Sequence, residues 1–169
     1  PGKALLRSGA RPGDTVFVTG TVGDAAAGLQ LLQDDDHDEF LVQRFLRPTA
    51  RVATGRALRG IAHAAIDLSD GLVADMSKLL AASGVGAEID IENIHLSAAL
   101  RKRFGVDEQR RFALTGGDDY ELCFTADADG VSDVDNITAI GRVVAEPGLT
   151  CRQNGVVVEV DDAGYRHFA

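Results

Sequence analysis

With 169 residues, of which 45% are hydrophobic, the chain is long enough for a single domain with a packed core. Its formal net charge of -9 argues against non-specific binding to nucleic acid or to an anionic membrane surface, because both need a basic protein surface. No apolar run of about 18 residues and no signal peptide is visible, so we expect a cytoplasmic protein without a transmembrane helix.

The first third of the chain predicts a strand, a glycine-rich turn and a helix. Residues 15–19 (TVFVT) are β-branched and aromatic, which favours a strand, and residues 25–32 have a helical pattern. The turn between them, residues 20–24 (GTVGD), resembles a phosphate-binding loop in outline but lacks the Lys and Ser/Thr of a P-loop. We interpret it as a tight turn that lets the helix and the strand pack closely, with phosphate binding as the alternative.

The next segment predicts an exposed acidic loop followed by two helices. Residues 34–39 (DDDHDE) indicate a solvated loop, and a metal site there is the alternative. Residues 40–46 predict a short helix that ends before Pro48, and residues 52–61 predict a second helix. The inward positions of the second helix are expected to be Val52, Leu58 and Ile61. Four arginines are expected to face solvent or to pair with acids: Arg47, Arg51, Arg56 and Arg59.

Residues 64–75 (AAIDLSDGLVAD) predict a buried strand, a polar turn and an amphipathic helix. Strand alternation places Asp67 and Ser69 on one side and Leu68 on the other. Two carboxylates beside a helix N-terminus would repel a phosphate unless a divalent cation lay between them, and Mg²⁺ is commonly held by one or two carboxylates and substrate phosphates. The sequence therefore indicates a Mg²⁺-phosphate site. The alternative is a helix capped by Ser69 or Asp70, with acids that only face water.

The remainder alternates strands and helices. Strands are expected at residues 87–91, 122–125 and 137–144, and helices at residues 96–104 and 107–112. Asn154-Gly155 predicts a hairpin between residues 149–153 and 156–160. Together these elements predict an α+β fold, a mixed β-sheet with helices packed on it. Cys123 and Cys151 match no zinc or redox spacing, and Cys123 is expected in the core.

A second acidic turn precedes the strand at residues 122–125. Gly116-Gly117 is followed by four polar residues, Asp118 to Glu121, directly before the strand begins. One interpretation is a turn whose acids tolerate a left-handed backbone, and the other is a functional site. The residues alone leave these two interpretations open.

Several motifs together resemble the C-terminal half of the thiamine-monophosphate kinase family, within the aminoimidazole ribonucleotide synthetase-like superfamily. The resemblance covers essentially the whole chain, residues 1–169, as a single C-terminal α/β domain, and the pairing of D-x-S-D-G-L with G-G-x-D-Y-E-L is its most specific part. The motifs are Arg7-Ser8-Gly9-Ala10, Val18-Thr19-Gly20-Thr21-Val22-Gly23-Asp24, Arg47-Pro48, Ile66-Asp67-Leu68-Ser69-Asp70-Gly71-Leu72, Thr115-Gly116-Gly117-Asp118-Asp119-Tyr120-Glu121-Leu122 and Gly164-Tyr165-Arg166-His167-Phe168.

The resemblance implies a role for individual residues. Arg7 and Ser69 match positions that contact ATP, and Asp67 and Asp70 match Mg²⁺ ligands. The thiamine substrate would be contacted at two further positions. Asp118 stands where the family usually has Glu, and Tyr165 stands where it has an aromatic residue, often Trp.

The resemblance also implies a reaction, in which the ATP γ-phosphoryl group is transferred in line to thiamine monophosphate with Mg²⁺ bound, giving thiamine diphosphate. The family's N-terminal domain, which supplies many metal ligands, is expected to lie outside this chain, so the isolated chain is expected to be inactive. The full-length enzyme is expected to be a homodimer. Alternatives are a superfamily enzyme with another phosphate acceptor and a non-catalytic assembly domain.

Overall fold

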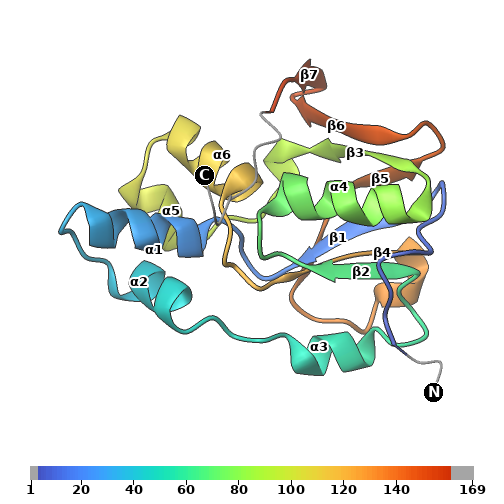
Figure 1. Cartoon of the computed structure of the whole chain (residues 1–169), viewed down its shortest axis with the longest axis horizontal. Helices are drawn as coiled ribbons and strands as arrows, with labels where there is room; N and C mark the ends of the chain where they lie inside the picture. Colours follow the sequence, from blue (N-terminus) through green and yellow to red (C-terminus); the bar gives the residue numbers. More distant parts are fainter. Residues whose placement is uncertain (1–3, 161–169) are drawn as a thin grey trace.

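The chain forms a seven-stranded mixed sheet with helices packed on it, as the sequence predicts. A computed structural model describes residues 4–160 (Figure 1). The strand order is β2-β4-β1-β5-β3-β6-β7. The strands are β1 (Thr15–Thr19), β2 (Ala64–Asp67), β3 (Gly86–Asp90), β4 (Leu122–Ala126), β5 (Ile137–Val144), β6 (Gly148–Gln153) and β7 (Val156–Val158). All neighbouring pairs are antiparallel except β3 and β6, which are parallel.

The helices surround this sheet, and α4 lies across one of its faces (Figure 1). The α-helices are α1 (Asp24–Gln33), α2 (Glu39–Leu46), α3 (Val52–Ala57), α4 (Leu72–Ser83), α5 (Ala98–Arg103) and α6 (Val106–Thr115). Two short 3₁₀ turns lie at Ile91–Asn93 and Ala128–Val131. Within residues 4–160 there is no helix with the length and apolar character that crossing a membrane requires.

Alternating side chains of the central strand β1 reach two separate apolar clusters. Val16 and Val18 belong to the cluster between α4 and the sheet, with Met76 of α4 among its members. Phe17 points to the other face and stacks on Phe124, with the ring centroids 5.2 Å apart. Because both faces of β1 are covered, this strand contains consecutive buried residues rather than an apolar-polar alternation.

A third cluster joins α1, α2, α5 and α6 beside the end of the sheet where α1 begins (Figure 1). Leu31, Leu41, Leu100 and Phe112 are its large buried members. The close approach of α1 to α2 depends on Gly28, since a Cβ atom there would lie 2.1 Å from the carbonyl oxygen of Leu41. This cluster therefore fixes the helices that carry the glycine-rich turn.

The structure corrects one helix and confirms several smaller predictions. Helix α3 ends at Ala57 instead of Ile61, and Val52 is 65% exposed instead of facing inward. The chain leaves the helix through Gly60 at φ +87°, while Leu58 is buried and Ile61 packs against the second cluster. The acidic run of residues 34–39 is largely exposed, as predicted. Cys123 is a buried core residue and Cys151 is buried as well, both as free thiols.

Candidate functional site

The two acidic turns singled out in the sequence lie against each other. The amide of Leu68 donates to the carbonyl of Glu121, and the amide of Tyr120 donates back to the carbonyl of Leu68, each over 2.8 Å. One residue further along, the amide of Asp118 donates to the carbonyl of Ser69 over 3.0 Å. These bonds extend the β2–β4 pairing beyond the strands and join both turns into one backbone unit.

Two glycines permit this close approach. A Cβ atom on Gly117 would lie 2.5 Å from the carbonyl oxygen of Ser69. Gly71 has φ +116°, and its Cβ atom would lie 3.0 Å from the backbone carbonyl of Thr115. Backbone atoms cannot yield as a flexible side chain can, so a side chain at Gly117 would separate the two turns.

The capping alternative for Ser69 and Asp70 is wrong. Gly71 is the N-cap residue of α4, and no side chain there caps the helix. The carboxylate of Asp75, in the first turns of the same helix, accepts the amides of Ser69 and Asp70 instead, each over 2.8 Å. The side chains of Ser69 and Asp70 are thereby not needed as helix caps.

Lys78 connects the two acids of this region. Its Nζ donates to Asp70, and it lies 2.8 Å from Oδ1 of Asp75. These hydrogen bonds raise the pKa of Lys78 above its ordinary value, and the bond to Asp70 contributes more than the bond to Asp75. Lys78 is thus a cation held beside Asp70.

A cavity of about 670 Å³ gathers three of the residues assigned to the site by their resemblance. Arg7, Asp67 and Ser69 all line it, and Lys78 lines it beside them. As alternation predicted, Leu68 is buried while Asp67 is exposed and Ser69 is half-buried. The apolar part of the wall is formed by Leu5, Val52, Ile66 and Leu122. The cavity therefore combines an apolar wall with oxygen donors and cationic side chains.

The other predicted residues lie elsewhere, and Asp70 is not among the residues that line this cavity. Asp118 lines a neighbouring cavity of about 260 Å³, between α1 and α6. Tyr120, which the sequence analysis did not select, lines the first cavity, and its hydroxyl lies 3.4 Å from Oδ1 of Asp118. The contact between Asp118 and Tyr120 therefore joins the walls of the two cavities. Tyr165 lies outside the described residues.

Negative charge concentrates around Tyr120. The charge of Asp118 is the largest contribution that raises the pKa of Tyr120, and the charges of Asp67 and Asp70 add to it. Both Asp118 and Tyr120 have a left-handed backbone, with φ +66° and +51°. This backbone is rare for a bulky aromatic residue, and such strain is often found at functional sites.

The alternate residues of this turn point inward. Glu121 is fully buried and accepts both Nε and Nη2 of Arg51, at 2.6 and 2.5 Å. Arg44 donates to the same carboxylate over 3.0 Å, and the hydroxyl of Thr19 donates over 2.5 Å. A buried carboxylate needs this many partners to offset its lost hydration. Glu121 thus holds the turn in place through its buried hydrogen bonds and ion pairs.

Asp119 is also buried, and it resolves the question of the glycine-rich turn. Its carboxylate accepts the amide of Gly23 over 2.6 Å and that of Ala25 over 3.1 Å, at the start of α1. Burial raises the pKa of Asp119 to about 7, although the two amides oppose the shift. A phosphate would need these amides, so the alternative of a phosphate loop at residues 20–24 is wrong. The tight-turn interpretation is confirmed, since a Cβ atom on Gly23 would lie 2.8 Å from the amide nitrogen of Ala113.

These anchors do not show in the sequence pattern, because they are set by contacts between distant segments. Asp75 and Lys78 occupy the polar positions of an amphipathic helix, which ordinarily face solvent. The alternation of Asp118 to Glu121 was the available signal for two inward and two outward side chains. It could have indicated that Asp119 and Glu121 share one side of the chain, but not what they contact.

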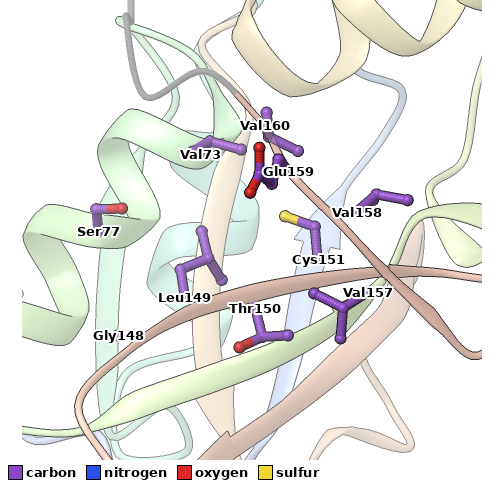
Figure 2. A pocket seen from close by; sticks show the side chains of 10 residues that line it. All are labelled: Val73, Ser77, Gly148, Leu149, Thr150, Cys151, Val157, Val158, Glu159 and Val160. Carbon is purple, nitrogen blue, oxygen red and sulfur yellow. The ribbon is translucent and has the colours of Figure 1, made fainter.

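Two other features lie apart from these residues. A groove of about 820 Å³ between α4, β6 and β7 is lined by apolar side chains such as Val73, Leu149 and Val158, with the thiol of Cys151 (Figure 2). Near the start of β1 and the end of β4, side-chain atoms of Asp14, His63 and Asp127 lie within 4.8 Å of one another. In the part of the chain that the structure describes, no other cluster of three such groups has metal-ligand spacing. The antiparallel register places it at the opposite end of the strands β2 and β4 from Asp67.

The donors around the first cavity fit a hard divalent cation. Asp67 and Asp70 offer carboxylate oxygens, and Ser69 offers a hydroxyl, which are the ligand types that Mg²⁺ prefers. The charges of Asp118, Asp67 and Asp70 also raise the pKa of Tyr120, which lines the same cavity. Asp67 lines the cavity and is suited to hold such an ion directly, whereas the carboxylate of Asp70 is ion-paired with Lys78.

This fold, with acids and an arginine around one cavity, defines an α+β domain whose cavity combines oxygen donors with cationic side chains. The chain belongs to the family of AIR synthase related proteins, because residues 11–159 match the C-terminal domain of that family.

Its relatives are thiamine-monophosphate kinases. The chain is 45% identical to the thiamine-monophosphate kinase of Salmonella typhimurium over 183 residues, which cover 99% of this chain and 56% of the relative. The chain therefore spans about half the length of the curated relatives it matches.

Solved structures agree with this placement. The thiamine-monophosphate kinase of Stenotrophomonas maltophilia K279a is 42% identical, with a TM-score of 0.85 over 93% of this chain and 55% of that one. The structure of AaThiL complexed with AMPPCP and TMP is 40% identical, with a TM-score of 0.86 over 97% of this chain and 54% of that one.

Proposed function

We propose that this chain is the C-terminal part of a thiamine-monophosphate kinase, a transferase that moves the γ-phosphoryl group of ATP to thiamine monophosphate and gives thiamine diphosphate. The observation that carries the proposal is the cavity lined by Asp67 and Ser69 of one turn and by Arg7 from a distant segment of the chain. The reaction is taken from the names of the relatives, and the complex of AaThiL with AMPPCP and TMP supports a protein that binds both a nucleotide and TMP.

The residues of the cavity have complementary roles in this proposal. Asp67 and Asp70 hold Mg²⁺, while Ser69 and Arg7 contact the ATP phosphates. When bound, the ion would neutralise charge on the nucleotide phosphates. No covalent nucleophile is required, since phosphoryl transfer depends mainly on positioning and on charge neutralisation. The acceptor is itself a phosphate that is anionic at neutral pH, so the chain needs no strong general base.

The acceptor is proposed to lie on the Asp118 side of the site. Asp118 is one methylene shorter than the usual Glu of the family, but its left-handed backbone and its contact with Tyr120 present it between the two cavities. Tyr165 is proposed as the second contact to the thiamine moiety.

The proposal includes partners that this chain does not contain. The curated relatives are about twice as long, so we infer an N-terminal domain that completes the metal and nucleotide sites. We also infer a homodimer in the full-length enzyme, a cytoplasmic location, and no kinase activity for the 169-residue chain alone.

Calorimetric titration of Mg²⁺-ATP tests the site, using this chain and the full-length protein. Asp67→Ala and Asp70→Ala should each weaken binding at least tenfold, because each removes a carboxylate that holds the ion. Asp133→Ala is the matched control, since Asp133 is an exposed acid outside this cavity. Equal affinity in the wild type and both site variants of the full-length protein would contradict the site.

A kinase assay of the full-length protein tests the reaction. Thiamine monophosphate should be phosphorylated far faster than other phosphate monoesters, and Asp67→Ala should abolish the activity. Preference for another phosphate acceptor would contradict the proposed substrate while leaving the ATP site intact.

A further inference from the structure

Asp75 holds the turn that carries the proposed cation and phosphate ligands. Its side chain is almost fully buried, with the residue 1% exposed. One carboxylate oxygen, Oδ2, accepts the amides of both Ser69 and Asp70 over 2.8 Å. The other oxygen, Oδ1, accepts from Nζ of Lys78 over 2.8 Å.

This arrangement separates backbone support from ligand binding. The amides of Ser69 and Asp70 precede the N-cap residue Gly71, so α4 itself offers them no carbonyl. Without Asp75 these two half-buried amides would lack their shared acceptor. The side chains of Ser69 and Asp70 would then be the nearest groups able to accept hydrogen bonds from them. Because Asp75 fills that role, neither side chain is shown bonded to these amides: Ser69 lines the cavity and Asp70 pairs with Lys78.

We propose that Asp75 is a positioning residue, which fixes the Asp67 to Asp70 turn in its binding geometry before Mg²⁺-ATP arrives. The inference rests on the proposed function only for the identity of this ligand. A turn that is already ordered loses less conformational freedom on binding, and residues that orient ligand-bearing groups commonly affect metal affinity by about 10 to 100-fold.

Competing anchors are weaker. The bond from the amide of Asp118 to the carbonyl of Ser69 fixes the turn from the opposite side, but it leaves both amides unsatisfied. Lys78 contacts the side chain of Asp70 and not the backbone of the turn, and it is partly exposed. Asp75 is thus the one described side chain shown bonding to both backbone amides.

Two substitutions at Asp75 separate its two contacts. Asp75→Ala removes the acceptor for both amides. In Asp75→Asn the side-chain oxygen is expected to keep facing the two backbone amides. The opposite orientation would place the NH₂ group against two N–H donors, whereas the expected orientation places it against one mobile donor, Nζ of Lys78. Lys78→Met is the matched control, since it removes the other partner of Asp75 and leaves both amide bonds intact.

The experiment measures backbone amides and ligand affinity in the full-length protein. Amide hydrogen exchange of Ser69 and Asp70 should be slowed at least tenfold, without ligand, in the wild type, in Asp75→Asn and in Lys78→Met. Asp75→Ala should lose this protection, while amides in the β1–β4 ladder stay protected. Mg²⁺-ATP affinity should fall at least tenfold in Asp75→Ala and by less than about threefold in Asp75→Asn.

Each result decides the proposal. Rapid exchange of both amides in the wild type overturns it, even where Asp75→Ala does not fold. Equal Mg²⁺-ATP affinity in the wild type and a folded Asp75→Ala also overturns it, and the proposed function then stands. If both amides are protected through Asp75 but the wild type binds no Mg²⁺-ATP, the turn is positioned as inferred and the proposed function fails instead.

Discussion

The backbone amide of Asp118 donates a hydrogen bond of 3.0 Å to the carbonyl of Ser69. This bond ties the turn proposed to contact the thiamine moiety to the turn proposed to contact the ATP phosphates. A phosphoryl group passes between two bound anions only when both are held in fixed relative positions. In the proposed reaction, the pairing of the two turns would align the phosphoryl donor with the acceptor.

Gly117→Ala should disrupt this pairing. The added Cβ atom would lie 2.5 Å from the carbonyl oxygen of Ser69, so the turns must separate. We expect a loss of stability of about 1 to 3 kcal/mol and at least tenfold weaker Mg²⁺-ATP binding, measured by urea denaturation and calorimetry. Gly130→Ala is the control, since its Cβ atom would make only an ordinary contact, 3.7 Å from Ile61. Unchanged affinity in Gly117→Ala would show that the pairing does not support binding.

Ser83→Ala should weaken nucleotide binding through Arg7. The hydroxyl of Ser83 accepts the amides of Gly9 and Ala10, each over 3.2 Å, and donates to the carbonyl of Arg7 over 3.3 Å. Its loss should cost only about 1 kcal/mol of stability, because the site is partly exposed. The Arg7 segment would then be held less firmly, and Mg²⁺-ATP affinity should fall about threefold to tenfold.

The control for that experiment is Ser77→Ala on the same helix. Ser77 lines the separate groove of Figure 2 and not the proposed ATP cavity. The same loss of affinity in both variants would mean that α4 is merely destabilised.

Glu121→Gln should be strongly destabilising. It neutralises a fully buried carboxylate, removes the charged partner that Arg51 pairs with, and leaves Arg44 with Asp24, 3.8 Å from its Nε. Breaking a buried ion pair by removing one partner typically costs about 3 to 5 kcal/mol. The midpoint of thermal or urea unfolding measures this loss. Glu39→Gln, at an exposed position, should change stability by less than about 0.5 kcal/mol, and a similar small loss in Glu121→Gln would contradict the prediction.

Asp119 should make the protein less stable as the pH rises from about 4 to 7. Burial raises the pKa of Asp119 to about 7 from 3.8, so the folded state keeps a proton that the unfolded state has already lost. The proton that the folded state retains stabilises it relative to the unfolded state at low pH. The resulting contribution to the free energy of unfolding declines by about 1.4 kcal/mol per pH unit within that window.

Comparison with Asp119→Asn isolates this group, because the other titrating groups largely cancel in the difference. The lost acceptor for the Gly23 or Ala25 amide adds an offset that does not depend on pH. The stability of the wild type relative to the variant, from urea unfolding at several pH values, should therefore decrease between pH 4 and pH 7. A constant difference would show that ionisation of Asp119 costs nothing in the fold.

Local patterns were sufficient for most of the elements. The β-branched run at residues 15–19 and the periodicity that follows Gly71 predicted β1 and α4, and Asn154-Gly155 predicted the hairpin of β6 and β7. The inward position predicted for Val52 was wrong because this residue fits an apolar helical pattern, yet in the fold it lines a cavity instead of the core. Periodicity records which side chains share a face, and it does not record what covers that face.

The sequence by itself determined the mixed sheet, the two acidic turns and the family to which they belong, because strand alternation, helix periodicity and turn chemistry act over a few residues. Tertiary structure alone decided what each acid does. Asp67 faces the cavity with Arg7, while Asp119 bonds to the amides of α1, Glu121 is neutralised by two arginines, and Asp75 holds the Ser69 turn. A carboxylate acquires its role from the donors and the burial around it, and these come from segments far away in the chain.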